Sequence, residues 1–104
     1  MSFTSPIPAR LKEARKKAKL SQKALGVRIG MDEGSASARM NQYEKAKHTP
    51  DIQTLKLIAE ELRVPLNYFF CEEESSAKLA CLIAKLSEEE RQELINKLSG
   101  SEDS

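Results

Sequence analysis

The sequence predicts an all-α fold, and three observations support this. Apolar residues recur at the i, i+3 and i+4 spacing of a buried helical face in one segment after another. Capping residues and helix-breaking pairs separate these segments, whereas no stretch alternates polar and apolar residues as a strand would. The chain has 104 residues, of which 39% are hydrophobic and 32% are charged, and this suits one helical domain with a short appendage.

Two helices are expected at the start of the chain, over residues 8–19 and 22–29. Ser21 is a suitable N-cap for the second helix, because its side-chain oxygen can accept a bond from an orphan backbone N–H. Gly30 follows this helix at the position where a left-handed residue is commonly needed. The residues expected on the buried face of the first helix are Ile7, Leu11, Ala14 and Ala18.

Three more helices complete a five-helix unit. The third should include residues 35–45. Thr49-Pro50-Asp51 then ends one segment and begins a fourth helix, and Val64-Pro65 opens a short fifth one. The residues expected to point inward from these helices are Ala36, Met40, Tyr43, Leu55, Ile58, Ala59, Leu62, Leu66, Phe69 and Phe70.

Two amphipathic helices are expected in the tail. The acids of residues 72–74 suit the start of the first, where the helix dipole favours negative charge. Ser87 and Glu90 form a capping box for the second, which Gly100 closes. The predicted organisation is an N-terminal arm (1–7), a main domain (8–70), a helical extension (71–99) and a disordered tail (100–104).

Charge is distributed unevenly along the chain. The formal net charge is only +1. Residues 1–50 contain eleven Lys or Arg and four Asp or Glu, a balance of +7, whereas residues 51–104 contain six and twelve, a balance of −6. This asymmetry favours a polyanion-binding front and an acidic back, although a basic patch alone is equally compatible with an ordinary solvated surface.

The residues do not support catalysis, a cofactor or a metal site. The chain has one His, no Gly-rich phosphate loop and no nucleophile set. Cys71 and Cys81 lie ten residues apart and are interpreted as free thiols of a cytoplasmic protein, with a disulfide as the alternative. No apolar stretch approaches the roughly 20 residues that span a bilayer, so no membrane association is expected.

Several short motifs together carry a family resemblance. They are Arg10-Leu11-Lys12, Leu20-Ser21-Gln22, Ala24-Leu25, Gly30, Tyr43-Glu44, Pro50, Thr54-Leu55 and Tyr68-Phe69-Phe70. With this spacing, residues 8–70 resemble the Cro/C1-type (XRE-like) helix-turn-helix family. The resemblance implies a lambda-repressor-like domain of five helices, whose third helix enters the major groove of DNA, usually as a dimer on a pseudo-palindrome.

The chain departs from this family in three places. Gly26 stands where alanine is usual, which should loosen the second helix. Ala46 stands where a glycine normally ends the third helix. About four extra residues fall within residues 31–36, close to one helical turn. We expect them to extend the third helix at its N-terminus with Asp32 as the cap; a longer loop is the alternative.

The resemblance assigns roles to particular side chains. Base contacts are expected from one face of the third helix, where Arg can grip guanine and Gln or Asn can grip adenine. The candidates are Ser37, Ala38, Arg39 and Gln42, followed by Ser35 and Asn41. Phosphate contacts are expected at the start of the second helix, on the first helix and in the loop after the third helix. The candidates are Gln22, Lys23, Arg10, Lys45, Lys47 and His48. Arg15 and Glu44 should form a partly buried salt bridge.

The predicted function is sequence-specific regulation of transcription, as a repressor, by a homodimer on double-stranded DNA. The residues alone do not distinguish repression from activation. The tail helices are expected to contribute to the dimer interface. The alternative is an antitoxin-like or adaptor protein, whose tail binds a protein partner while the helix-turn-helix domain tethers it to DNA.

Overall fold

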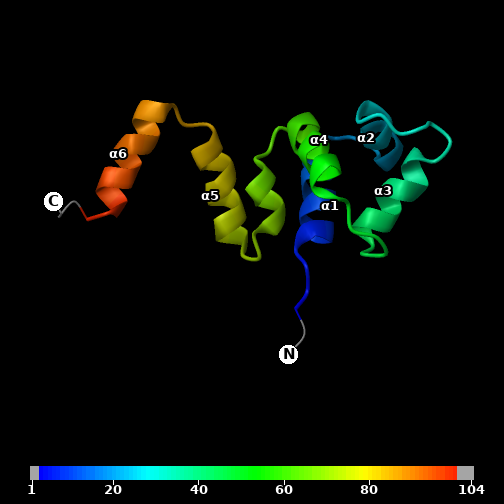
Figure 1. The fold of residues 1–104 in the computed structure, drawn as a ribbon, viewed down its shortest axis with the longest axis horizontal. Coiled ribbons are helices and arrows are strands. Elements are labelled where there is room, and N and C mark those ends of the chain that lie inside the picture. Colours follow the sequence, from blue (N-terminus) through cyan, green and yellow to red (C-terminus); the bar gives the residue numbers. More distant parts are fainter. Residues whose placement is uncertain (1–2, 101–104) are drawn as a thin grey trace.

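A computed structural model describes residues 3–100, and all regular secondary structure within them is helical (Figure 1). The expected all-α architecture is therefore confirmed. The elements are α1 (Ile7–Lys17), α2 (Gln22–Arg28), α3 (Ala36–Glu44), α4 (Ile52–Leu62), the 3₁₀ helix η1 (Leu66–Phe70), α5 (Glu74–Ala84) and α6 (Glu88–Leu98). The first two residues of the expected arm and the last four of the expected disordered tail lie outside the described residues.

One hydrophobic core holds α1 to α4 and η1 together. Its centre consists of large side chains contributed by all five elements. The largest that are fully buried are Leu11, Leu25, Met40, Leu55, Ile58 and Phe69. Most of these residues were expected to point inward from their helical spacing. Two residues expected to point inward do not: Phe70 is 47% exposed in the tight turn of η1, and Ala18 is exposed beyond the end of α1.

Side-chain caps and left-handed residues set the helix boundaries. The hydroxyl oxygen of Ser21 accepts a bond from the Ala24 backbone N–H (2.9 Å), as its sequence position predicts. Asp51 caps α4 by accepting from the Thr54 N–H (2.8 Å), and this bond lowers the pKa of the Asp51 carboxyl. Ala46 adopts a left-handed φ of 63°. The turn after α3 thus has the conformation that a glycine would adopt without strain.

The expected extra turn at the start of α3 is wrong. Residues 31–35 form a longer connection, and α3 begins at Ala36. The side chain of Asp32 does not cap the helix; its backbone carbonyl instead accepts bonds from the N–H groups of Ser35 (3.1 Å) and Ala36 (2.9 Å). Met31 holds the other end of the connection, because its N–H binds the Gly26 carbonyl (2.9 Å) and its side chain packs on the core.

Gly26 has a packing role that its helix propensity does not reveal. It is buried where α2 crosses α3, and a Cβ atom at this position would lie 2.8 Å from Cβ of Ala36. Real Cβ atoms do not approach this closely, and the Ala36 methyl group cannot rotate away. The glycine therefore permits the close contact between the two helices, and with it the position of α3.

Replacing Gly26 with alanine should destabilise the protein by about 1–2 kcal/mol, because overpacking outweighs the gain of up to about 1 kcal/mol in helix propensity. Adding Ala36→Gly removes the clashing methyl group, so the double variant should recover most of the loss. Thermal melts of the two single variants and the double variant measure this coupling. Additive losses would contradict the proposed contact.

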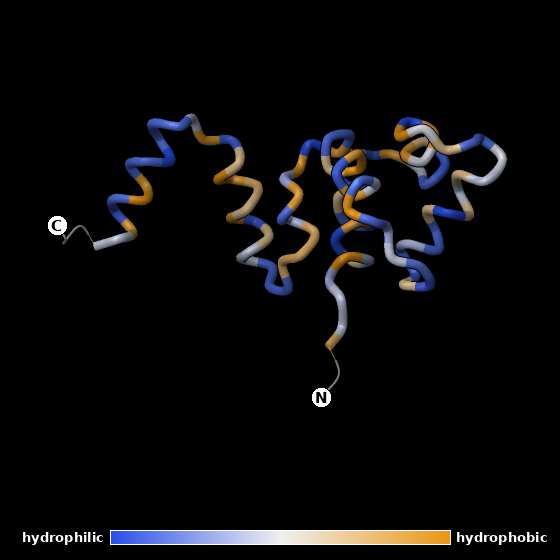
Figure 2. The backbone as a smooth tube through the Cα atoms, viewed as in Figure 1, coloured by the Kyte–Doolittle hydropathy of each residue, from blue (hydrophilic) through white to orange (hydrophobic). Residues whose placement is uncertain are grey.

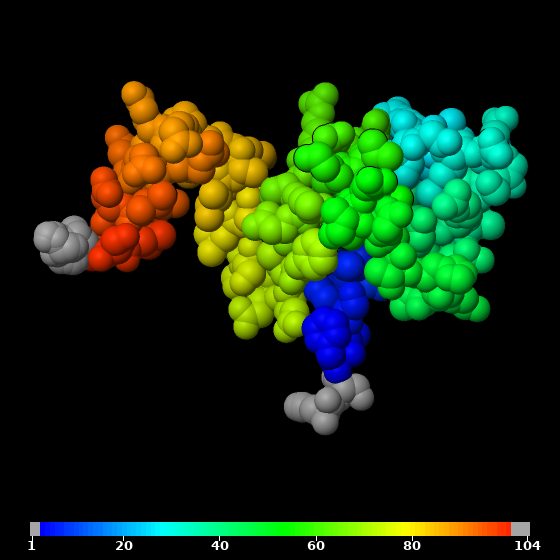
Figure 3. All heavy atoms as spheres, viewed as in Figure 1, coloured from blue at the N-terminus to red at the C-terminus, as the bar shows by residue number. Residues whose placement is uncertain are grey.

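The tail extends away from this domain. Figures 1 and 3 show α6 at one end of the long axis, and α2 and α3 at the other. The molecule measures 57 × 36 × 22 Å along its principal axes. α5 packs on η1 through Ala77 and Ala80, whereas no residue of Glu88–Leu98 in α6 is buried. The capping box expected between Ser87 and Glu90 is present.

Candidate nucleic-acid interface

α3 presents a polar face to solvent on the side opposite its core contacts. Ala36, Met40 and Tyr43 are buried and define the inner face. With 3.6 residues per turn, the residues pointing furthest from that face are Ala38, Asn41 and Lys45, with Ser37 and Gln42 beside them. All of these are exposed except Gln42, which is half-buried. The face therefore offers polar side chains and the methyl group of Ala38 to solvent.

Arg39 and Ser35 lie less favourably than the sequence suggested. Arg39 is exposed, but it precedes Met40 and lies at the edge of the buried face. Ser35 is the half-buried residue that precedes α3, and its side chain makes no capping bond. Asn41 projects more directly outward than either, so the geometry places it among the central candidates for base contact.

Gln22 connects the start of α2 to the outer face of α3. Its Nε2 donates to Oδ1 of Asn41 (3.1 Å) and to Oε1 of Glu44 (3.0 Å). The backbone N–H groups of the first turn of a helix point toward its N-terminus, where they favour an anion. The Gln22 bonds fix the position of this N-terminus relative to Asn41.

The expected ion pair between Arg15 and Glu44 is present. The guanidinium of Arg15 donates to both Glu44 carboxylate oxygens, from Nη2 to Oε1 at 3.1 Å and from Nε to Oε2. Nη1 donates to the Leu20 carbonyl (2.8 Å). The two side chains are only 11% and 3% exposed. This pair joins α1 to the end of α3, and Gln22 extends the same network to α2.

A family comparison identifies this arrangement. The helix-turn-helix family model matches residues 11–69, more than half of the chain. The chain belongs to the Cro/C1-type helix-turn-helix family. No curated protein sequence matches it. Among solved structures, it is similar to the crystal structure of the transcriptional regulator BswR, with 44% sequence identity and a TM-score of 0.81. The match covers 89% of this chain and 92% of that one, so it extends beyond residues 11–69 into the tail.

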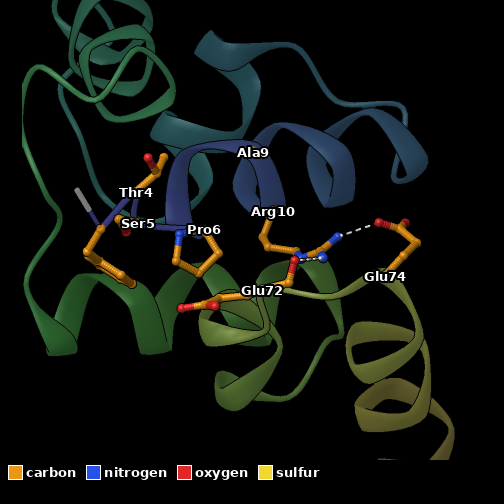
Figure 4. Close-up of a pocket in the computed structure, with 8 residues that line it drawn as sticks. Thr4, Ser5, Pro6, Ala9, Arg10, Glu72 and Glu74 are labelled. Atoms are coloured by element: carbon orange, nitrogen blue, oxygen red, sulfur yellow. Dashed lines mark hydrogen bonds and ion pairs between the residues drawn. The ribbon is translucent and has the colours of Figure 1, made fainter. Parts of the chain in front are cut away.

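In this helix-turn-helix protein, Arg10 does not lie where a phosphate contact requires it. The residue is 6% exposed, and its Nε donates to the Cys71 carbonyl (2.9 Å). Nη1 binds carboxylate oxygens of Glu13 (2.9 Å) and Glu74 (3.0 Å). Figure 4 shows the guanidinium directed at Glu72 and Glu74, beside the cleft under the N-terminal segment. The expected phosphate role is corrected accordingly: Arg10 holds the tail to α1.

The surroundings of Arg10 explain its burial. The Tyr68 hydroxyl donates to Glu13, and this bond lowers the pKa of the Glu13 carboxyl against the opposing effect of burial. Burial and the same bond raise the pKa of Tyr68. Burial alone would lower the pKa of Arg10, but its bonds to Glu74 and Glu13 outweigh that and raise it. A charged Arg10 is thus fully compensated within the protein.

The remaining phosphate candidates are accessible. Lys45, Lys47 and His48 are exposed at the end of α3 and in the following loop. The Gln42 carbonyl accepts bonds from the N–H groups of Lys47 (2.9 Å) and His48 (3.3 Å), which holds the loop against α3. Lys23 is exposed on the first turn of α2, and its Nζ lies 3.6 Å from Oε2 of Glu33. Sequence reasoning missed Glu33, because its position depended on the path of the connection.

Proposed function

We propose that this protein is a sequence-specific transcriptional regulator that binds double-stranded DNA through α3. The observation that carries the proposal is the exposed polar face of α3, held beside the N-terminus of α2 by Gln22. The family match and the similarity to a transcriptional regulator at 44% identity support the same function. No group of residues in the described part of the chain suggests a reaction, so we propose binding and not catalysis.

In this proposal α3 enters the major groove, and its outer side chains contact base edges. Asn41 and Gln42 carry amides that can pair with adenine, and the Ala38 methyl group can meet a thymine methyl. Ser37 and Arg39 flank them. Phosphates are held by the N-terminus of α2 on one side and by Lys45, Lys47 and His48 on the other. Such contacts release counterions, so affinity should fall steeply as salt rises.

We also propose that the tail joins two copies. α5 packs on the domain with small residues, and it directs its large apolar residues toward solvent. Leu79, Leu82 and Ile83 are 56%, 49% and 38% exposed, and Ile95 and Leu98 of α6 are 51% and 75% exposed. Figure 2 shows apolar positions along both tail helices, which extend away from the rest of the molecule. Complete burial of an exposed side chain of this size contributes about 1.5–3 kcal/mol, and a second copy could provide roughly half of that for each of these partly exposed residues.

The charges of α6 fit a pair of antiparallel copies. Glu88, Glu89 and Glu90 form its first turn, and Lys97 lies in its last. Two α6 helices related by a two-fold axis would place the acids of one copy near Lys97 of the other. An isolated helix of 11 residues is marginal in water, so α6 needs such a partner. A symmetric dimer would read a pseudo-palindrome in the cytoplasm and, by occupying a promoter, act as a repressor.

The second candidate is an adaptor whose tail binds a different protein. The observation that favours it is the same uncovered apolar surface of α5 and α6. A monomeric protein that still binds DNA would support this candidate over the homodimer.

Selection of random duplexes by the full-length protein tests the DNA-binding proposal. We expect an enriched pseudo-palindrome, and Asn41→Ala should weaken its binding by about 5- to 150-fold and relax selection at the contacted base. Asn96→Ala, the same change on exposed α6, is the matched control and should bind as the wild type does. Absence of any enriched sequence, with equal binding by both variants, would refute sequence-specific recognition.

A further inference from the structure

Acidic residues are few in the half of the chain that contains the proposed DNA-binding surface. Residues 1–50 contain four acids. Glu13 is bound to Arg10 and Tyr68, and Glu44 is bound to Arg15 and Gln22. The other two, Asp32 and Glu33, are exposed. Both lie in the lengthened connection between α2 and α3, so that connection carries the solvent-facing acids of the basic half.

One of these acids reaches into the proposed phosphate-binding region. Oε2 of Glu33 lies 3.6 Å from Nζ of Lys23, and the two side chains are 79% and 55% exposed. Lys23 directly follows Gln22, whose amide binds Asn41 on the outer face of α3. Glu33 is therefore located beside Lys23, one of the exposed cations through which the proposed interface would hold a phosphate.

We propose that Glu33 limits the affinity of this protein for DNA by competing with a backbone phosphate for Lys23. This inference rests on the proposed function, which it deepens by assigning a tuning residue to the same interface. When DNA is absent, the carboxylate partly neutralises Lys23. When DNA approaches, a phosphate must replace the carboxylate beside Lys23, and the attraction between Glu33 and Lys23 is lost.

The size of the effect follows from the exposure of the ion pair between Glu33 and Lys23. Such exposed pairs contribute only modestly, and less as salt increases. Removing the Glu33 charge should therefore raise affinity by about two- to five-fold at low salt. Lys23 would also become able to neutralise a phosphate and so release a counterion condensed on the DNA, which should steepen the slope of log K against log salt by up to about 0.9. Both effects are independent of base sequence, so random duplex DNA should gain as much as the selected site.

The test is Glu33→Gln in the full-length protein, titrated by fluorescence anisotropy against the selected duplex and a random duplex over a series of salt concentrations. Glu60→Gln is the matched control, because Glu60 is also exposed and the net charge changes equally. The third and fourth proteins are Lys23→Gln and the double variant. We expect tighter binding and a steeper salt slope for Glu33→Gln alone, and little further effect of this change once Lys23 is absent.

The outcomes separate this inference from the proposed function. Equal affinities for the wild type and Glu33→Gln, or an equal gain in the Glu60→Gln control, would overturn the competition while leaving DNA binding intact. A gain that persists in the Lys23→Gln background would also overturn it, because Glu33 would then act without Lys23. If the wild type binds neither duplex, the proposed function fails and this inference fails with it. Melting curves of all variants verify that each one is folded.

Discussion

Replacing Glu44 with alanine should destabilise the protein by about 3–5 kcal/mol, because the change leaves a buried guanidinium without its counter-charge. Arg15 is 11% exposed, and both Glu44 oxygens bind it. Gln22 would lose one of its two acceptors at the same time. For a domain of this size each kcal/mol lowers the melting temperature by about 4–8 °C, so a fall of at least about 12 °C is expected.

Thermal and urea unfolding of Glu44→Ala measure this effect. Glu88→Ala provides the control, because its ion pair with Arg91 is exposed on α6 and should contribute at most about 1 kcal/mol. Glu44→Gln keeps a hydrogen-bond acceptor for Arg15, so its loss should be smaller than that of the alanine variant. A melting temperature for Glu44→Ala that matches the Glu88→Ala control would contradict the buried-pair interpretation.

The parts of the fold that depend on local sequence patterns could be predicted. Helical spacing identified the buried positions Leu11, Met40 and Ile58, because the 3.6-residue period places them on one face whatever the neighbouring helices are. Ser21 and Ser87 cap helices through bonds to residues only three positions away. The family resemblance supplied the long-range pair of Arg15 and Glu44, which no local pattern specifies.

The parts that depend on three-dimensional contacts could not be predicted in the same way. Four extra residues are compatible with one added helical turn, and only the contact of Met31 with the core and α2 shows that the chain forms a longer connection. By helix propensity alone, Gly26 should destabilise α2, and only its contact with Ala36 in the fold shows why a glycine is needed there. Arg10 has the sequence context of a surface cation, and its burial depends on carbonyl groups about sixty residues away.

The sequence pattern of the tail predicts two helices with apolar faces, but it does not specify what covers those faces. A single copy buries the alanine face of α5 and leaves the leucines of that helix in water. The acids in the first turn of α6 and Lys97 in its last turn would lie near one another between copies in antiparallel orientation. The proposed dimer accounts for both observations, and it places the operator affinity partly under the control of residues far from α3.

Replacing Ile95 with aspartate should therefore convert the protein to a monomer and weaken binding to a pseudo-palindrome by about 100-fold or more, because the second half-site no longer adds avidity. A carboxylate within an apolar interface would lose its hydration without gaining a partner. Ile95 is 51% exposed in a single copy, so the DNA-binding domain should melt as before. Asn96→Asp adds the same charge one position along α6, away from the apolar face, and should remain dimeric. Sedimentation velocity and titration of the selected duplex measure both properties. A wild-type protein that sediments as a monomer, or an Ile95→Asp variant that stays dimeric, would exclude the tail as the site of self-association and favour a different protein as its partner.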